Sequence, residues 1–343
     1  MSQIDLGMAA ELQAASAAVR RQAQILAGPL TELVARLARK PPRVVVTCAR
    51  GSSAHAATFG KHLIEHRLGI PVAAAAPSIA TVYRRQLRLE GQLFLAISQS
   101  GRSDDLVEMT MIAKASDALT AAVVNDTASP LAAACDIVLP MAAGPEVSVA
   151  ATKTFVASLA ALLRLAAMWA GDGPLGAAVD RLPDRLAAAT GLDWSAALDV
   201  LAGTNSLVTI GRGPTLAIAR EASLKLKETS NLHAEAFSGA EFLHGPVALV
   251  STLYPILMFM PSDAAAGGLE DLTASLRHKG ARVLVAGHSE TTNDRLPTLP
   301  PDHPDTDPVC LIQSFYGLAV DLARRRGVDI DRPRHLQKVT RTR

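Results

Sequence analysis

A strand–turn–helix pattern occurs twice in the sequence at a fixed spacing, and this repeat constrains the fold more than any other feature. RVVVTCARGSS begins at Arg43 and SLVTIGRGPT begins 163 residues later at Ser206. LFLAIS at Leu93 and ILMFMP at Ile256 are also 163 residues apart, as are LTAAVV and RVLVAG. Three matches at one offset predict a duplicated unit of about 160 residues.

Each unit alternates short apolar runs with helical stretches. Runs of Val, Ile, Leu and Ala are typical of strands buried on both faces, and their alternation with helices predicts a parallel sheet with right-handed crossovers. The expected fold class is α/β, with two tandem domains that are each a doubly wound parallel sheet flanked by helices. We expect an N-terminal helical segment at 1–40, a first domain at 41–170, a linker helix at 171–198 with breaks at GDGP and LPDR, a second domain at 199–330 and a C-terminal tail at 331–343.

The composition excludes several classes of partner. Basic and acidic residues nearly balance, 34 against 32, and only 3% of the residues are aromatic. Neither property favours nucleic acid or an anionic membrane. The longest apolar stretch, residues 155–171, is interrupted by Arg164 and is shorter than the ~20 residues of a membrane span. With no recognisable targeting signal at the N-terminus, we expect a buried helix in a soluble, cytoplasmic protein.

Metal and cofactor signals are weak. The three cysteines form no CxxC pair, and Cys48 and Cys135 stand in or beside apolar runs, so we expect core positions and no disulfide or zinc site. His55, His62 and His66 have helical spacing, but no carboxylate completes a metal site. The glycines match neither a dinucleotide fingerprint nor a P-loop. We expect no metal and no cofactor.

One loop has the composition of a phosphate site. Ligands of open parallel sheets bind beyond the carboxyl ends of the strands, where residues 50–53, 98–103 and 211–214 are expected. The second of these loops offers three hydroxyls, a glutamine amide and a glycine, and the next helix adds unpaired N–H groups. A serine N-cap is the alternative, but a cap needs only one hydroxyl. Residues 261–263 of the second unit read Pro-Ser-Asp, so we expect one phosphate site per chain.

A second group of polar residues lies on a predicted helix. Glu221, Lys225 and Glu228 fall within about 60° of one helical face, beside an apolar arc. This arrangement suits proton transfer on a small polar substrate, although a solvated row of ion pairs remains the alternative. A loop with His233, Glu235, Glu241 and His244 is expected to follow.

These motifs resemble the sugar isomerase (SIS) domain family over the whole chain. The likeness is to the isomerase half of glucosamine-6-phosphate synthase, and most of all to stand-alone type II glucosamine-6-phosphate deaminases. Galactosamine-6-phosphate isomerase-deaminases and fructosamine-phosphate deglycases are also similar. The resemblance implies substrate contacts by Gly51, Ser52, Ser53, Ser98, Gln99, Ser100, Ser103, Glu146 and Val149.

The resemblance also implies catalytic roles. Glu228 resembles the carboxylate that moves a proton between C1 and C2 of the sugar, and Lys225 resembles the lysine beside it. His244 resembles the ring-opening histidine, which in the family comes from the neighbouring subunit, so a homodimer with a shared active site is implied. Lys338 resembles the tail lysine that meets the open-chain carbonyl. General acid–base chemistry near pH 7 suits a partly buried Glu and a His.

The sequence departs from the family pattern in places that concern the substrate. Ala151 stands where a hydroxyl is expected, and Ser52 where a threonine is usual. No glutaminase segment is recognisable, so we expect the reaction to run from glucosamine 6-phosphate to fructose 6-phosphate and ammonia. Galactosamine-6-phosphate deamination and deglycation remain alternatives, and so does a non-catalytic regulator that binds phosphosugars. One cleft is expected to serve both Ser98 and Glu228.

Overall fold

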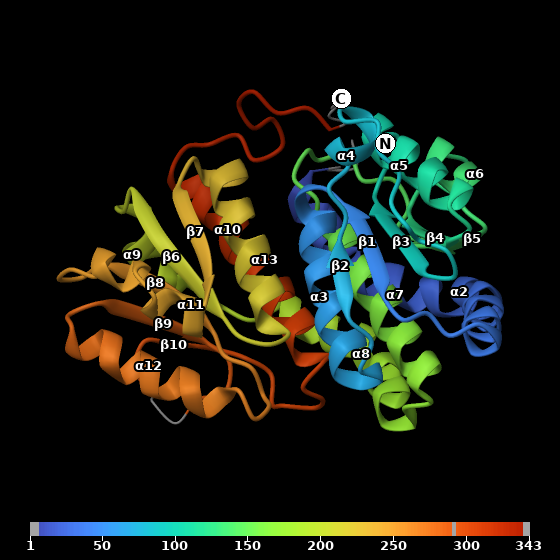
Figure 1. The fold of residues 1–343 in the computed structure, drawn as a ribbon. Coiled ribbons are helices and arrows are strands. Elements are labelled where there is room, and N and C mark those ends of the chain that lie inside the picture. The colour runs from blue at the N-terminus through green and yellow to red at the C-terminus, as the bar shows by residue number, and fades with distance from the viewer. Residues whose placement is uncertain (1–6, 290–292, 339–343) are drawn as a thin grey trace. The chain divides into compact units, whose positions relative to one another are not determined.

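The computed structural model describes residues 7–289 and 293–338 (Figure 1). The chain divides into two compact units. The N-unit contains residues 17–146, 153–183 and the described tail from 337, and the C-unit contains residues 7–16, 147–152 and 184–336. The segment 147–152 therefore interrupts the N-unit in sequence while belonging to the C-unit.

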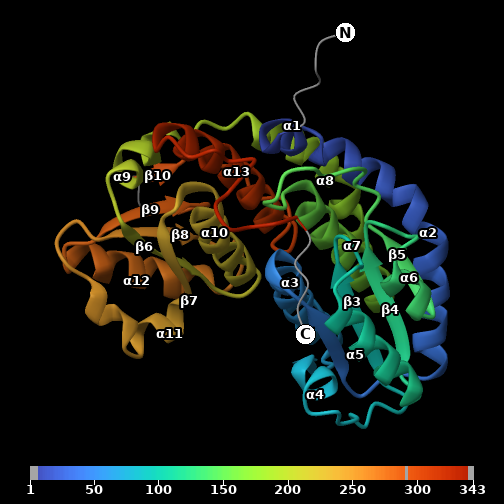
Figure 2. The same ribbon diagram turned by 90° about the horizontal axis from the view of Figure 1, so that it is seen from above.

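The N-unit contains a five-stranded parallel sheet in the order β2-β1-β3-β4-β5. Every residue of β3 is buried, as expected for a strand covered on both faces. Figure 2 shows α7 and α5 on opposite faces of β3 and β4. The strands are β1 (Val45–Ala49), β2 (Val72–Ala74), β3 (Leu93–Ser98), β4 (Leu119–Val124) and β5 (Ile137–Pro140).

The C-unit contains a second five-stranded parallel sheet, in the order β10-β9-β8-β6-β7. Counted from its own first strand, this order is the same as in the N-unit. The structure thus confirms two doubly wound parallel sheets flanked by helices. The strands are β6 (Ser206–Gly211), β7 (His233–Ser238), β8 (Pro255–Phe259), β9 (Arg282–Ala286) and β10 (Arg295–Leu296).

Helices connect the strands. The first part of the chain forms α1 (Met8–Gln13), α2 (Ala15–Arg39), α3 (Gly51–Leu68), α4 (Ser78–Thr81), α5 (Asp104–Ala115), α6 (Pro130–Ala134), α7 (Lys153–Ala170) and α8 (Gly173–Thr190). The second part forms α9 (Leu198–Ala202), α10 (Thr215–Ser230), α11 (Gly239–Leu243), α12 (Ala266–His278) and α13 (Asp307–Arg325), with short 3-10 turns at Ser195–Ala197 and Pro246–Leu249.

Two helices end where the sequence predicts. After α3, Gly69 adopts a left-handed conformation with φ of 66°, and its N–H bonds to the carbonyl of Glu65. After α10, Asn231 takes the same conformation with φ of 49°. Glycine and asparagine tolerate this region of backbone space, which explains their place at helix ends.

The N-terminal segment consists of two helices, α1 and α2, with Ala14 between them. Two details of the predicted layout were wrong. Pro183 does not break the linker helix, because α8 continues through it to Thr190. The stretch after His233 is not a loop but the edge strand β7, which pairs with β6 along its whole length. Pairing with a neighbouring strand overrides the polar local sequence there.

The most apolar helix is part of the protein core. By length and composition α7 could cross a membrane, but 78% of it is buried inside the protein, which is typical of a core helix. The predicted buried helix is therefore confirmed. The three cysteines are free thiols; Cys48 is buried as predicted and Cys135 is only half-buried. Burial, with the nearby Asp105 carboxylate, raises the pKa of Cys48 to about 12.

Candidate functional site

The predicted phosphate loop lies where the strand order of the N-unit reverses. With the order β2-β1-β3, the connections from β1 and β3 leave the sheet in opposite directions, and this crevice is the usual ligand position in such sheets. The helices α3 and α5 begin directly after these two strands. Their first-turn N–H groups and positive dipole ends favour an anion.

Local hydrogen bonds shape the loop between β3 and α5. Ser98 Oγ accepts the N–H of Gly101 at 3.1 Å, and Ser100 Oγ accepts the N–H of Arg102 at 3.3 Å. Gly101 has φ of 62°, and a Cβ there would lie 2.1 Å from Ser129 Oγ. The loop therefore requires glycine at this point, for its conformation and for space.

The two helix starts lack serine caps. Ser103 occupies the N-cap position of α5, but its side chain makes no capping hydrogen bond. Arg50 at the N-cap of α3 makes none either, and Ser52 and Ser53 follow in the first turn. The capping alternative for Ser103 is therefore not supported. The hydroxyls of residues 98–103 and the first turn of α3 form a candidate anion site. We call residues 98–103 the seryl loop.

An ion pair between a half-exposed arginine and a buried aspartate joins the end of β1 to the start of α5, and no local pattern in the sequence indicates it. Arg50 Nε and Nη2 donate to Asp105 Oδ2 at 3.0 and 2.7 Å. The Asp105 side chain is only 2% exposed, and its other oxygen accepts the N–H of Leu106. The two residues are 55 positions apart, so only the neighbouring strands bring them together. The pair fixes the start of α5 relative to the end of β1.

Glu146 connects the C-terminal tail to α7 within the N-unit. Its carboxylate accepts the Thr154 N–H at 3.1 Å and the Thr154 hydroxyl at 2.6 Å, at the start of α7. Lys338 Nζ donates to the same carboxylate at 3.1 Å. The Glu146 side chain is fully buried and that of Lys338 is 24% exposed. The structure thus brings together two predicted site residues, Glu146 and Lys338. Val149 is half-buried in the segment 147–152, and its contact with substrate stays a prediction.

The acid–base residues of α10 are buried, not solvated. Glu221 and Lys225 are 0% and 1% exposed, and Glu228 is 20% exposed. Lys225 Nζ forms an ion pair with Glu228 and lies 3.4 Å from Glu221 Oε1. The solvated row of ion pairs is therefore excluded. A lysine held between two carboxylates, one of them accessible, is a geometry suited to proton transfer.

The charge state of Lys225 follows from its neighbours. Burial lowers the pKa of an ammonium, but the carboxylates of Glu221 and Glu228 outweigh this effect and raise the pKa of Lys225 above its usual value. Lys227, two residues further on, is exposed and has a lowered pKa, chiefly because of desolvation. The two carboxylates therefore favour the ammonium form of Lys225.

His244 lies at the end of α11 and is exposed. Its backbone N–H donates to the carbonyl of Glu241. Among the described residues, the imidazole of His244 has no hydrogen-bond partner. The predicted role of His244 in a neighbouring subunit's site stays a prediction. His233, Glu235 and Glu241, which the sequence placed in the same polar stretch, are exposed as well.

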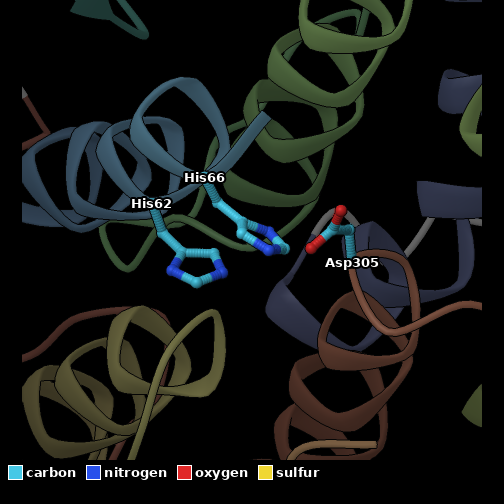
Figure 3. Close-up of side chains that lie close together, drawn as sticks. All are labelled: His62, His66 and Asp305. Carbon is cyan, nitrogen blue, oxygen red and sulfur yellow. The ribbon is translucent and has the colours of Figure 1, made fainter. Parts of the chain in front are cut away.

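The histidines of α3 form a pair. His62 and His66 lie one turn apart with ring centroids 5.5 Å from each other (Figure 3). Asp305, which Figure 3 also labels, belongs to the C-unit. Two imidazoles are fewer than the three or four protein ligands of a typical zinc site, and within residues 17–146 and 153–183 the described side chains supply no third ligand.

Two five-stranded parallel sheets of the same strand order, each flanked by helices, define an α/β protein with a duplicated domain. The SIS domain model matches residues 39–168 and 200–293. The chain belongs to the SIS domain family, as the motifs predicted.

Two similar proteins have names that refer to phosphorylated sugars. A protein from Silicibacter pomeroyi, provisionally named a phosphosugar isomerase, is 44% identical with a TM-score of 0.90, over 94% of this chain and 99% of that one. Glutamine–fructose-6-phosphate aminotransferase [isomerizing] from Symbiobacterium thermophilum is 36% identical over 313 residues, 86% of this chain. The match covers 51% of that relative, so this chain spans about half the length of the curated relatives it matches.

A more distant structure shares the fold alone. Glucosamine-6-phosphate deaminase from Thermotoga maritima is 22% identical with a TM-score of 0.74, over 96% of this chain and all of that one.

Proposed function

We propose that the protein is an amino-sugar phosphate isomerase-deaminase that converts glucosamine 6-phosphate and water to fructose 6-phosphate and ammonia. The observation that carries this proposal is the buried Glu221–Lys225–Glu228 group, in which Glu228 alone is partly exposed. The names of the similar proteins, a phosphosugar isomerase and an aminotransferase that uses fructose 6-phosphate, support a phosphosugar substrate.

The seryl loop binds the phosphate in this proposal. Ser98, Gln99, Ser100 and Ser103 offer short polar side chains without a lysine, and the N-termini of α3 and α5 supply oriented N–H groups. Gly51, Ser52 and Ser53 in the first turn of α3 belong to the same anion site. Binding by backbone and hydroxyl groups selects a phosphate and leaves the rest of the sugar free to change shape.

The reaction needs ring opening, two proton transfers and a hydrolysis. His244 exchanges a proton with the ring and hydroxyl oxygens to open the sugar. Glu228 takes the proton from C2 and returns it to C1, and a second proton passes from the C2 amine to the oxygen on C1. Together these transfers turn the aldehyde into a hydroxymethyl group and the C2 amine into an imine. Water then adds to the imine carbon and ammonia leaves, so the atoms balance. Lys225 stabilises the negative charge of the enediolate-like intermediate, and Lys338 assists at the open-chain carbonyl.

Other features of the proposal follow from the same roles. The shared His244 requires a homodimer, and the chemistry needs no metal, nucleotide or redox cofactor. A phosphosugar substrate and a mostly buried apolar helix are consistent with a cytoplasmic enzyme that has no nucleic acid or membrane partner. Since the chain spans only about half of its curated relatives, the glutamine-dependent activity named for them is not assigned to it.

An ammonia-release assay tests the proposal. The purified protein is incubated with glucosamine 6-phosphate, galactosamine 6-phosphate and a fructosamine phosphate. Ammonia and ketose phosphate are measured for the two hexosamine phosphates, and free amine and aldose phosphate for the fructosamine phosphate. We expect equal amounts of the two products from glucosamine 6-phosphate, with the highest kcat/KM for that substrate. Preference for one of the other two substrates would support the matching alternative. Binding of a phosphosugar without turnover would support a regulator and contradict the proposal.

A further inference from the structure

The sheet of the C-unit reverses direction in the same way as that of the N-unit. With the order β9-β8-β6-β7, the connections from β6 and β8 leave the sheet in opposite directions, and ligands of such sheets bind at this point. Two hydroxyl residues lie close to these strand ends. At the offset of 163 residues, Thr215 corresponds to Ser52 and Ser262 corresponds to Gln99. Their partners therefore show what the second copy of the fold does with its crevice.

Thr215 is used within the fold. Its hydroxyl donates to the carbonyl of Phe259, at the end of β8, at 2.8 Å and accepts the N–H of Arg212 at 3.0 Å. The residue is 0% exposed. The hydroxyl of Thr215 thus joins the ends of β6 and β8 and does not face a ligand.

Ser262 binds a carboxylate of the chain itself. Its hydroxyl donates to Asp307 Oδ2 at 2.6 Å. Asp307 is the first residue of α13, and its side chain is only 14% exposed. A negative charge therefore lies against the loop after β8, which corresponds to the seryl loop after β3.

The Asp307 carboxylate also receives donors from two other parts of the C-unit. Arg185 Nη2, near the end of α8, donates to Oδ1 at 3.0 Å, and its side chain is 18% exposed. The backbone N–H of Asp302 donates to Oδ1 at 3.1 Å, and the N–H of His303 does so at 3.4 Å. A guanidinium, a hydroxyl and backbone N–H groups beside a helix start are the donors that proteins use for oxyanions.

A small cavity lies beside this carboxylate. Its volume is about 20 Å³, which is room for about one water molecule. Its walls include Arg185, Ser262, Gly287, Asp307 and Cys310. The carboxylate therefore fills most of the space between its donors, and too little remains for a phosphate.

We propose that the C-unit contains a site for a small oxyanion and that the Asp307 carboxylate is its built-in ligand. We call this group of donors, with Arg185, Ser262 and residues 302–303, the Asp307 site. Its occupant closes this part of the C-unit to free anions and leaves the seryl loop as the candidate anion site at the other strand reversal. The inference concerns binding alone, so it does not depend on the proposed function, and either can fail without the other.

A simple tether is the alternative. The pair between Arg185 and Asp307 would then only fasten α8 to the start of α13, and a free anion could not take the place of the carboxylate. In an oxyanion site the donors are held by the rest of the fold, so a free oxyanion can replace the carboxylate. Formate is the suitable probe, because it is a carboxylate without a side chain.

Thermal unfolding of the wild type and Asp307→Ala, in sodium formate and in sodium chloride of equal concentration, tests the proposal. The variant should unfold at a lower temperature than the wild type in chloride. Once formate exceeds its Kd, each tenfold increase should raise the midpoint of the variant by about 3 °C, because a ligand of the folded protein stabilises it with the logarithm of concentration. The wild type, whose Asp307 site is filled, should gain less, and its gain measures formate bound elsewhere.

Two further variants show where formate binds. Asp307→Ala combined with Ser262→Ala lacks the hydroxyl donor, so its response to formate should fall toward that of the wild type. Asp263→Ala is the matched control, because it removes a carboxylate of the same loop that accepts the N–H of Ala265, and it should respond as the wild type does.

Equal responses of Asp307→Ala and the wild type to formate overturn the proposal. A formate response of Asp307→Ala that the Ser262→Ala change leaves undiminished also overturns it, because formate then binds at another place. If Asp307→Ala does not fold in chloride, its refolding yield in formate decides. A yield no higher than in chloride would show that Asp307 is a tether and not the ligand of an oxyanion site.

Discussion

At the scale of single residues, accessibility separates the roles in the α10 group. Glu228 reaches solvent while Glu221 and Lys225 do not. A charged lysine in the core costs desolvation unless carboxylates compensate for it, and here two of them do. The group therefore depends on each member's charge, and removing the accessible carboxylate should affect chemistry more than folding.

We expect Glu228→Gln to lower kcat by two to four orders of magnitude, which is what removal of a general base costs. Binding of the sugar phosphate should persist, because the seryl loop is untouched. Steady-state kinetics and calorimetric binding measure the two effects. Asp271→Asn, which removes an exposed carboxylate from α12 of the same unit, is the matched control. Near-normal turnover in Glu228→Gln would contradict the assignment of Glu228.

At the scale of elements, the anion site depends on how the ends of β1 and β3 are held. The seryl loop is shaped by its own serine–backbone bonds, and the Arg50–Asp105 pair joins it to the strand beside it. The seryl loop could be predicted from the sequence, because hydroxyls, glycine and a following helix are local signals. The Arg50–Asp105 pair could not be predicted, since its partners meet only when two parallel strands lie side by side.

Arg50→Ala should destabilise the protein by about 2 kcal/mol, because it leaves the buried Asp105 carboxylate without its cation while Arg50 itself is half-exposed. The KM for a phosphorylated substrate should rise as the start of α5 loosens. Arg36→Ala, which breaks a pair whose side chains are 40% and 55% exposed, should cost less than ~1 kcal/mol. Denaturant unfolding compares the two, and equal losses would show that burial of Asp105 is unimportant.

At the scale of the whole molecule, two sheets of equal topology carry different residues at corresponding places. The loop after β3 has three serines, whereas residues 261–263 after β8 have one, and among the described helices a group like Glu221–Lys225–Glu228 lies on α10 of the C-unit and not on its counterpart α3. In the proposed function each copy of the fold therefore contributes one part of the chemistry, and His244 is proposed to act from a second chain.

Mixing two inactive variants tests that shared site. Glu228→Gln and His244→Ala homodimers should both be impaired. After mild unfolding and refolding together, half of the dimers are mixed, and each mixed dimer contains one site with both wild-type residues, so about a quarter of wild-type activity should return. Sedimentation confirms that dimers have formed. If activity does not return although dimers mix, Glu228 and His244 act within one chain.

The sequence by itself determined the duplicated α/β fold, the seryl loop and the face shared by Glu221, Lys225 and Glu228, because periodicity and spacing are local properties of the chain. Only the tertiary structure decided that this face is buried, that His233 begins a strand, that Arg50 meets Asp105 and that Lys338 meets Glu146. Burial and long-range pairing depend on which elements pack together, and no local pattern specifies that.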